Sequence, residues 1–110
     1  GGISALLKIA TQIDIPVVIS SALDSAVGIG VGLAAAGALP ELQHACGLGT
    51  GGLFVEDVTE AVAPVDGYLP VAVATPDPAR LAALAASPQR RRWWIDRVRA
   101  CYPLLEPIVR

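Results

Sequence analysis

The sequence predicts an α/β fold with parallel strands. Apolar residues recur at helical spacing over residues 3–13. A short apolar run at residues 15–19 shows no polar alternation over residues 17–19, as in a strand that is covered on both faces. Residues 44–48 are expected to form a second short strand. Only a few residues connect these segments. The resulting order of helix, strand, helix and strand is typical of α/β proteins.

Local signals predict where these elements begin and end. Pro16 ends any preceding helix, because the residue before a proline is pushed out of the α region. Asp24 or Ser25 is expected to cap the next helix, and Pro40 stops it. The second strand is expected to run into the glycine-rich residues 47–52.

The ends of both predicted strands suit a ligand site. A right-handed crossover between parallel strands brings their carboxyl ends to one edge of the sheet, where α/β proteins bind ligands. The N-terminus of the intervening helix would favour an anionic group there. No proton-transfer group accompanies these residues, and the serines would also suit a simple lead-in to a helix. The residues expected at this edge are Ser20, Ser21, Gly47, Leu48 and Gly49.

The second half is predicted to be less regular. Residues 53–63 suit a short helix or a loop, and residues 66–67 suit a turn. Residues 68–73 are expected to form an edge strand, because Pro70 cannot donate to a ladder. Acidic residues near position 57 are expected to form a solvated face that could sit opposite the arginines of the C-terminal end.

Two helices are predicted near the C-terminus. One begins near Pro78 and runs to about residue 86, and the other begins at Ser87 and carries the run RRRWW. Residues 80–110 hold seven arginines against two acidic residues, whereas residues 1–79 hold one lysine against eight. The basic end could meet the acidic part of the chain or an acidic partner. Acids interspersed among the arginines argue against nucleic acid as that partner.

Composition and motifs argue against several other classes. Cys46 and Cys101 are too few and too far apart for a disulfide framework, so a reducing, cytoplasmic location is expected. The longest apolar run, residues 26–39, is shorter than the roughly 20 residues of a spanning helix, so no membrane partner is expected. The string Gly47-x-Gly49-x-x-Gly52 matches the dinucleotide fingerprint, but no amphipathic helix is predicted after it. The chain contains no methionine and begins Gly-Gly, which suggests a fragment.

Several segments resemble a known family. IPVVISSALDSAVGIGVGLAAAGALPEL and HACGLGTGGLF resemble the end of the barrel of the o-succinylbenzoate synthases, a family of the enolase superfamily. PVDGYLPV, TPDPARL and QRRRWWIDRVRACY are similar to the C-terminal extension of its mycobacterial members. The resemblance implies that residues 1–52 form the last two strands and helices of a (β/α)-barrel. Residues 53–110 would then form an extension that packs toward the barrel and the capping domain.

The resemblance also implies a chemistry. The family dehydrates 2-succinyl-6-hydroxy-2,4-cyclohexadiene-1-carboxylate to o-succinylbenzoate in menaquinone biosynthesis, with Mg²⁺ stabilising the enediolate and a lysine moving protons. The lysines and metal ligands would lie outside this chain, which would hold no catalytic or metal-binding residue. It would supply a pocket wall against a small carboxylate substrate, and its partners would be the remainder of the barrel and the capping domain. The wall residues implied are Ser20, Ser21, Gly47, Leu48 and Gly49.

Alternative functions stay open at this point. Within the superfamily, an N-acylamino-acid racemase or a dipeptide epimerase would use the same barrel with different pocket walls. From another class, the chain could be a non-catalytic binding module that uses the Arg/Trp helix, and nucleotide binding ranks last. Two strands with two covering helices leave much apolar surface without a partner, so the isolated chain is expected to be marginally stable.

Overall fold

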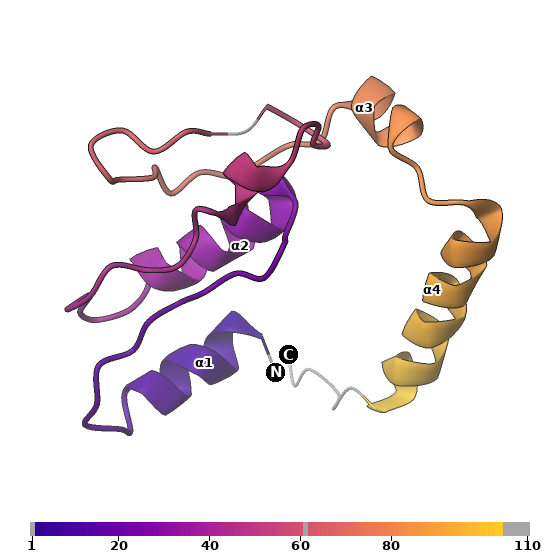
Figure 1. Cartoon of the computed structure of the whole chain (residues 1–110). Helices are drawn as coiled ribbons and strands as arrows, with labels where there is room; N and C mark the ends of the chain where they lie inside the picture. The colour runs from indigo at the N-terminus through magenta and orange to yellow at the C-terminus, as the bar shows by residue number, and fades with distance from the viewer. Residues whose placement is uncertain (1, 61, 105–110) are drawn as a thin grey trace.

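The computed structural model describes residues 2–60 and 62–104, and the described part is mostly helical (Figure 1). Its radius of gyration is 16.2 Å, whereas a compact domain of this length has a value of about 13 Å. The chain is therefore an open structure. Its helices are α1 (Ile3–Ala10), α2 (Ala26–Gly37), α3 (Pro78–Ala83) and α4 (Pro88–Cys101), with 3₁₀ turns η1 (Thr50–Leu53) and η2 (Tyr102–Leu104).

The two predicted parallel strands are reduced to one parallel bridge, between Ser20 and Gly47. The Gly47 amide donates to the Ile19 carbonyl at 2.8 Å, and the Ser21 amide donates to the Gly47 carbonyl at 2.9 Å. The predicted direction of pairing is confirmed, but the prediction of regular strands at 15–19 and 44–48 is wrong. A pair of short segments without further strands beside it is only marginally stable, and a sheet needs three or more strands.

The predicted turn at residues 66–67 is confirmed, but the edge strand after it is not formed. Asp66 and Gly67 have φ angles of 51° and 81°, the left-handed values of a tight hairpin turn. Val65 and Tyr68 form an antiparallel bridge across this turn. After Tyr68, the described backbone forms no further bridge to a neighbouring strand. Pro70 has no backbone amide with which to extend the pairing.

The predicted helices all form, although some end early. α1 ends at Ala10 and α3 at Ala83, each three residues before the expected end. α2 begins directly after Ser25, as predicted. Asp77 caps α3 by accepting from the Arg80 amide at 2.9 Å. Ser87 caps α4 in the same way, with 3.3 Å to the Arg90 amide.

A small apolar core lies where α1, α2 and the two bridged segments meet (Figure 1). Gly32 lets α2 approach the second segment, because a Cβ atom there would lie 2.7 Å from a methyl carbon of Leu48. The bridge and the packing on α2 therefore hold the ends of both segments in place. The buried members of the core are Ile19, Ala36, Leu39 and Leu48, and Leu6, Leu7, Val17 and Leu33 pack against them half-buried.

The C-terminal helices lie away from this core. Every residue from 77 to 104 is exposed, and α4 lies apart from α1 and α2 (Figure 1). The only ion pair in the described residues joins Arg99 to Asp96 within α4, at 3.6 Å. Within the described residues, no acidic residue of the first half forms an ion pair with an arginine of the C-terminal helices. The division of the chain at residue 52 stays a prediction.

Candidate functional site

The ends of the two bridged segments form one continuous edge, which we call the rim: Ser20, Ser21, Gly47, Leu48, Gly49 and Thr50. The bridge between Ser20 and Gly47 brings together the two groups of residues that the sequence predicts to meet. Thr50, the first residue of η1, completes the rim. Sequence reasoning missed Thr50, although its position directly after Gly49 was the available signal.

Ser21 fastens the two segments to each other. Its backbone amide and its hydroxyl both donate to the Gly47 carbonyl, at 2.9 Å and 3.0 Å. The same hydroxyl oxygen lies 2.8 Å from Oγ1 of Thr50. Both side chains are half-buried. Ser21 thus lies in a network of three short hydrogen bonds within the protein.

Ser20 is held more loosely. Its side chain is exposed, and its hydroxyl reaches only the Ser21 carbonyl at 3.4 Å, which is long for a hydroxyl donor. Gly47 faces it closely, since a Cβ atom on Gly47 would lie 2.8 Å from the Ser20 hydroxyl oxygen. Glycine at position 47 therefore leaves room for the Ser20 side chain.

The N-terminus of α2 is capped by a carboxylate of the chain itself. Asp57 is buried, with 8% of its surface exposed. One of its oxygens accepts from the Ala26 amide at 2.7 Å, and the other accepts from the Val58 amide at 2.6 Å. The prediction that Asp57 belongs to a solvated acidic face is wrong, because α2 begins beside it and its free N–H groups favour a negative charge. The anion that the sequence predicts at this helix end is thus supplied internally.

A cavity of about 360 Å³ lies between α2 and residues 59–60 and 62–75, a volume in the range of small-ligand pockets. Leu48 and Gly49 of the rim line it, together with Asp57 and apolar residues of α2. Ser20, Ser21 and Gly47 lie outside its lining. The rim therefore has an apolar cavity on one side and the exposed hydroxyl group of Ser20 on the other.

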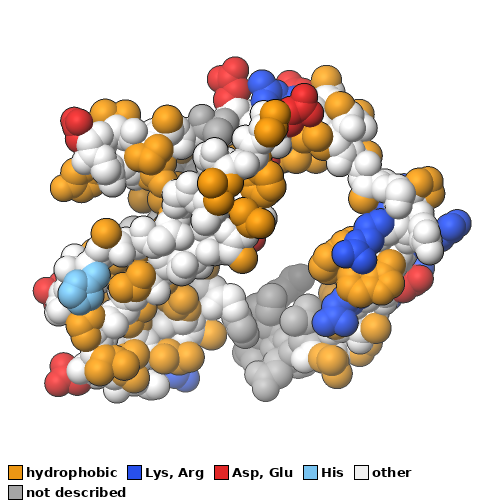
Figure 2. Space-filling view, viewed as in Figure 1, with side chains coloured by type: hydrophobic (Ala, Val, Ile, Leu, Met, Phe, Trp, Pro, Cys, Tyr) orange, Lys and Arg blue, Asp and Glu red, His pale blue; other side chains and the backbone are white. Residues whose placement is uncertain are grey.

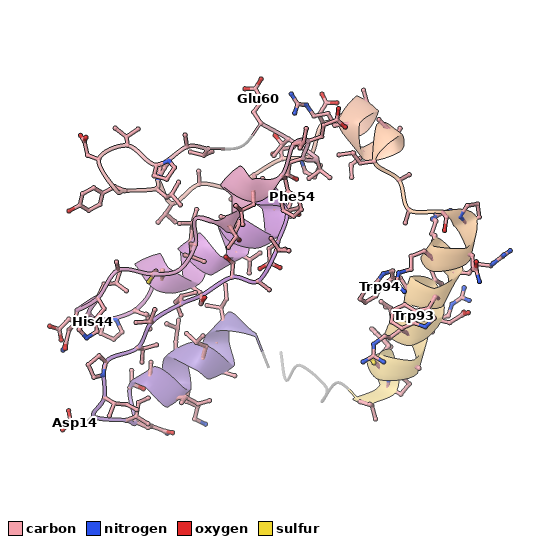
Figure 3. All side chains as sticks on the ribbon, viewed as in Figure 1. Asp14, His44, Phe54, Glu60, Trp93 and Trp94 are labelled. Carbon is pink, nitrogen blue, oxygen red and sulfur yellow. The ribbon has the colours of Figure 1, made fainter. Side chains whose placement is uncertain are left out.

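The glycine-rich string is not followed by the helix that a dinucleotide site requires. After Gly49 the chain forms η1, a single turn of four residues, and then leaves helical structure at Phe54 (Figure 3). A pyrophosphate needs the N-terminus of a full helix after this string. The geometry therefore gives no support to nucleotide binding.

No metal site is present in residues 2–60 and 62–104. No three histidine, cysteine, aspartate or glutamate side chains gather there closely enough to hold an ion. His44 is exposed at the outer end of the second segment, away from α4 (Figure 3). Within the same residues, no helix has the length and apolar character needed to cross a bilayer.

The Arg/Trp helix, α4, carries an exposed aromatic cluster. The rings of Trp93 and Trp94 meet edge to face with their centroids 4.8 Å apart. The guanidinium carbons of Arg90 and Arg97 lie 5.0 Å and 5.8 Å from the Trp93 ring centre, within cation–π range. Hydrophobic side chains and arginines alternate over this surface (Figure 2). The side chains of this cluster thus contact one another along the surface of α4.

The rim and the cavity together define the class of site. Two parallel segments separated by a helix, with hydroxyl and backbone polar groups at their ends, form the arrangement in which α/β enzymes bind small substrates. This chain contributes two such segments and one apolar cavity beside them.

The chain is similar in sequence to several o-succinylbenzoate synthases. Those of Mycobacterium tuberculosis and Mycobacterium bovis are 76% identical to this chain over 107 residues, and that of Mycobacterium ulcerans is 74% identical over 105 residues. The matches cover 97% and 96% of this chain. No family model matches the chain.

The chain spans only about a third of the length of these relatives, with 33% and 32% covered. At this identity the resemblance is confirmed: in sequence, the chain corresponds to one third of an o-succinylbenzoate synthase.

Proposed function

We propose that the chain supplies one wall of the substrate pocket of an o-succinylbenzoate synthase. The whole enzyme dehydrates 2-succinyl-6-hydroxy-2,4-cyclohexadiene-1-carboxylate to o-succinylbenzoate in menaquinone biosynthesis. The observation that carries the proposal is the parallel bridge between Ser20 and Gly47. It brings the ends of two segments together in a chain that is 76% identical to synthases of this name.

The proposal includes the fold of the whole enzyme. The two bridged segments and α2 between them are one strand–helix–strand unit of a (β/α)-barrel of the enolase superfamily, at its C-terminal end. The parallel direction of the bridge and the packing of α2 on Leu48 support this assignment. The neighbouring strands would come from chain outside these residues, and their pairing would extend the single bridge into regular strands.

The proposal gives the rim a binding role and no catalytic one. The substrate is a small carboxylate, which a hydroxyl donor and backbone amides at the rim would orient beside the apolar cavity. The described residues do not fit a Mg²⁺ ion, which is usually held by carboxylates, since no three histidine, cysteine, aspartate or glutamate side chains gather in them. In line with the resemblance, we assign the metal ligands and the proton-transferring lysines to residues outside this chain.

The location proposed for the enzyme is the cytoplasm. Cys46 and Cys101 are both free, as is usual in a reducing compartment. The remaining partners proposed are the rest of the barrel and the capping domain. The open shape of the chain, and the exposure of every residue of α4, are consistent with surfaces that such partners would cover.

A chimeric enzyme tests the proposal. The matching third of the Mycobacterium tuberculosis synthase is replaced by the 107 aligned residues of this chain, and o-succinylbenzoate formation is followed with Mg²⁺ present. We expect kcat/KM within about tenfold of the parent enzyme, which is about 1.4 kcal/mol of transition-state binding. The isolated 110-residue chain serves as a control and should show no turnover.

Two outcomes would contradict the proposal. One is a chimera that folds, as judged by circular dichroism and thermal unfolding, but forms no product. The other is a chimera that racemises N-acylamino acids or epimerises dipeptides without dehydrating the cyclohexadiene substrate. Dehydration by the isolated chain would contradict the assignment of all chemistry to residues outside it.

A further inference from the structure

The hydroxyl groups of the rim form a chain of hydrogen bonds with a fixed direction. The hydroxyl oxygen of Ser21 lies 3.0 Å from the Gly47 carbonyl and 2.8 Å from Oγ1 of Thr50. A serine hydroxyl carries one hydrogen, and a carbonyl oxygen only accepts. Ser21 therefore donates to Gly47, and Thr50 donates to Ser21.

This direction leaves Ser21 without a donor for a ligand. A carboxylate only accepts hydrogen bonds, so it binds where a donor is available. The hydroxyl and the amide of Ser21 both point to the Gly47 carbonyl. Binding a carboxylate through Ser21 would break a short bond inside the protein and leave Gly47 with one partner fewer.

Ser20, in contrast to Ser21, has a hydroxyl group that is available as a donor to a ligand. Its hydroxyl is exposed, and the 3.4 Å contact with the Ser21 carbonyl is weak. Rotation about one bond would turn this hydroxyl to a ligand at little cost. Ser20 is therefore the side-chain donor that the rim can offer to a carboxylate.

Thr50 holds the rim in shape from the other side. It is half-buried at the start of η1, directly after Gly49, which lines the apolar cavity. Its hydrogen bond to Ser21 ties the start of η1 to the end of the first segment. The Thr50–Ser21–Gly47 chain thus fixes Gly49 and its backbone between the two segments.

We propose that the rim contains two kinds of residue, one that contacts the substrate and one that positions the rim. Ser20 donates to the substrate carboxylate, whereas Thr50 and Ser21 are positioning residues that hold the rim through the Thr50–Ser21–Gly47 chain. The assignment of Ser20 rests on the proposed function. The role of Thr50 in holding the rim is independent of it.

The test uses the chimeric enzyme and single substitutions in it. Ser20→Ala should raise KM about fivefold, the effect of losing one hydrogen bond, and leave amide exchange at Ser21 and Gly47 unchanged. Thr50→Val should lower kcat/KM and speed exchange of those two amides, each about fivefold. Thr50→Ser keeps the hydroxyl and should restore both values.

The matched control is Thr11→Val, since the Thr11 hydroxyl bonds to the Lys8 carbonyl at the end of α1 and lies outside the rim.

A double-substitution cycle separates positioning from independent contacts. Because Ser21 and Thr50 act in one chain of bonds, Ser21→Ala combined with Thr50→Val should cost no more in kcat/KM than the larger single loss. Additive losses, or a Thr50→Ser variant no better than Thr50→Val, would overturn the positioning role. Ser20→Ala with an unchanged KM would overturn the donor role.

The experiments distinguish a failure of the proposed function from a failure of the role given to Thr50. A folded chimera without turnover contradicts the proposed function and the donor role of Ser20. The exchange rates still decide the role of Thr50 in that case. Parent-like exchange at Ser21 and Gly47 in Thr50→Val would then overturn it.

Discussion

At the scale of single residues, the most consequential contact is the one between Asp57 and α2. A buried carboxylate is stable only where hydrogen bonds replace water. Asp57 meets this need with the Ala26 and Val58 amides, at 2.7 Å and 2.6 Å. The bond to Ala26 also connects the loop after the rim to the start of α2, the helix on which the rim packs. Asp57 thus stabilises the site without belonging to the rim.

Replacing Asp57 by asparagine should destabilise this connection. The amide group of asparagine has only one accepting oxygen, so one of the two backbone amides would face a donor and lose its partner. We expect the chimera to lose about 1–3 kcal/mol in its free energy of unfolding. Faster amide exchange at Ala26 should accompany the loss, and thermal unfolding and hydrogen exchange measure the two effects.

Glu56→Gln is the matched control, because Glu56 is exposed and adjacent in sequence. It should change stability by no more than about 0.5 kcal/mol. Equal effects of Asp57→Asn and Glu56→Gln would show that the buried contact contributes nothing to stability.

At the scale of elements, helices were predictable from sequence and strands were not. Local signals determine helix starts: Asp77 and Ser87 precede prolines and cap α3 and α4 with their own side chains. Strands depend on partners distant in sequence. The apolar residues 15–19 and 44–48 pair correctly in direction, but without further strands they make one bridge.

The same distinction applies to the rim and its surroundings. The meeting of Ser20 and Ser21 with Gly47 followed from the handedness of a helical crossover, which sequence order determines. The burial of Asp57 depends on how a loop folds back over 31 residues to α2. Nothing local distinguishes Asp57 from its exposed neighbour Glu56, so the sequence could not separate their roles.

At the scale of the whole molecule, the chain buries too little apolar surface for a stable core. Among the described residues only six apolar side chains are buried, and two of them are alanines. Large side chains such as Val55, Val73 and Leu104 are 80% exposed or more. Extensive apolar surface of this kind marks regions that another part of a protein covers. This agrees with a chain that spans a third of the length of its relatives.

The isolated 110-residue chain should therefore behave as a loosely packed protein. We expect it to bind a hydrophobic dye and to unfold gradually with temperature, because few buried contacts are lost together. The chimeric enzyme, which supplies the missing surfaces, is the control and should unfold cooperatively without dye binding. A sharp two-state transition of the isolated chain at low protein concentration would contradict this expectation.

The central claim is that the rim forms one wall of the substrate pocket. The most direct measurement is a crystal structure of the chimeric enzyme with o-succinylbenzoate bound. We expect a carboxylate oxygen of the ligand within about 2.7–3.2 Å of the Ser20 hydroxyl or of a backbone amide at Leu48 or Gly49. The Ser21 hydroxyl should remain on the Gly47 carbonyl. A ligand bound in the barrel with no polar atom near the rim would contradict the claim.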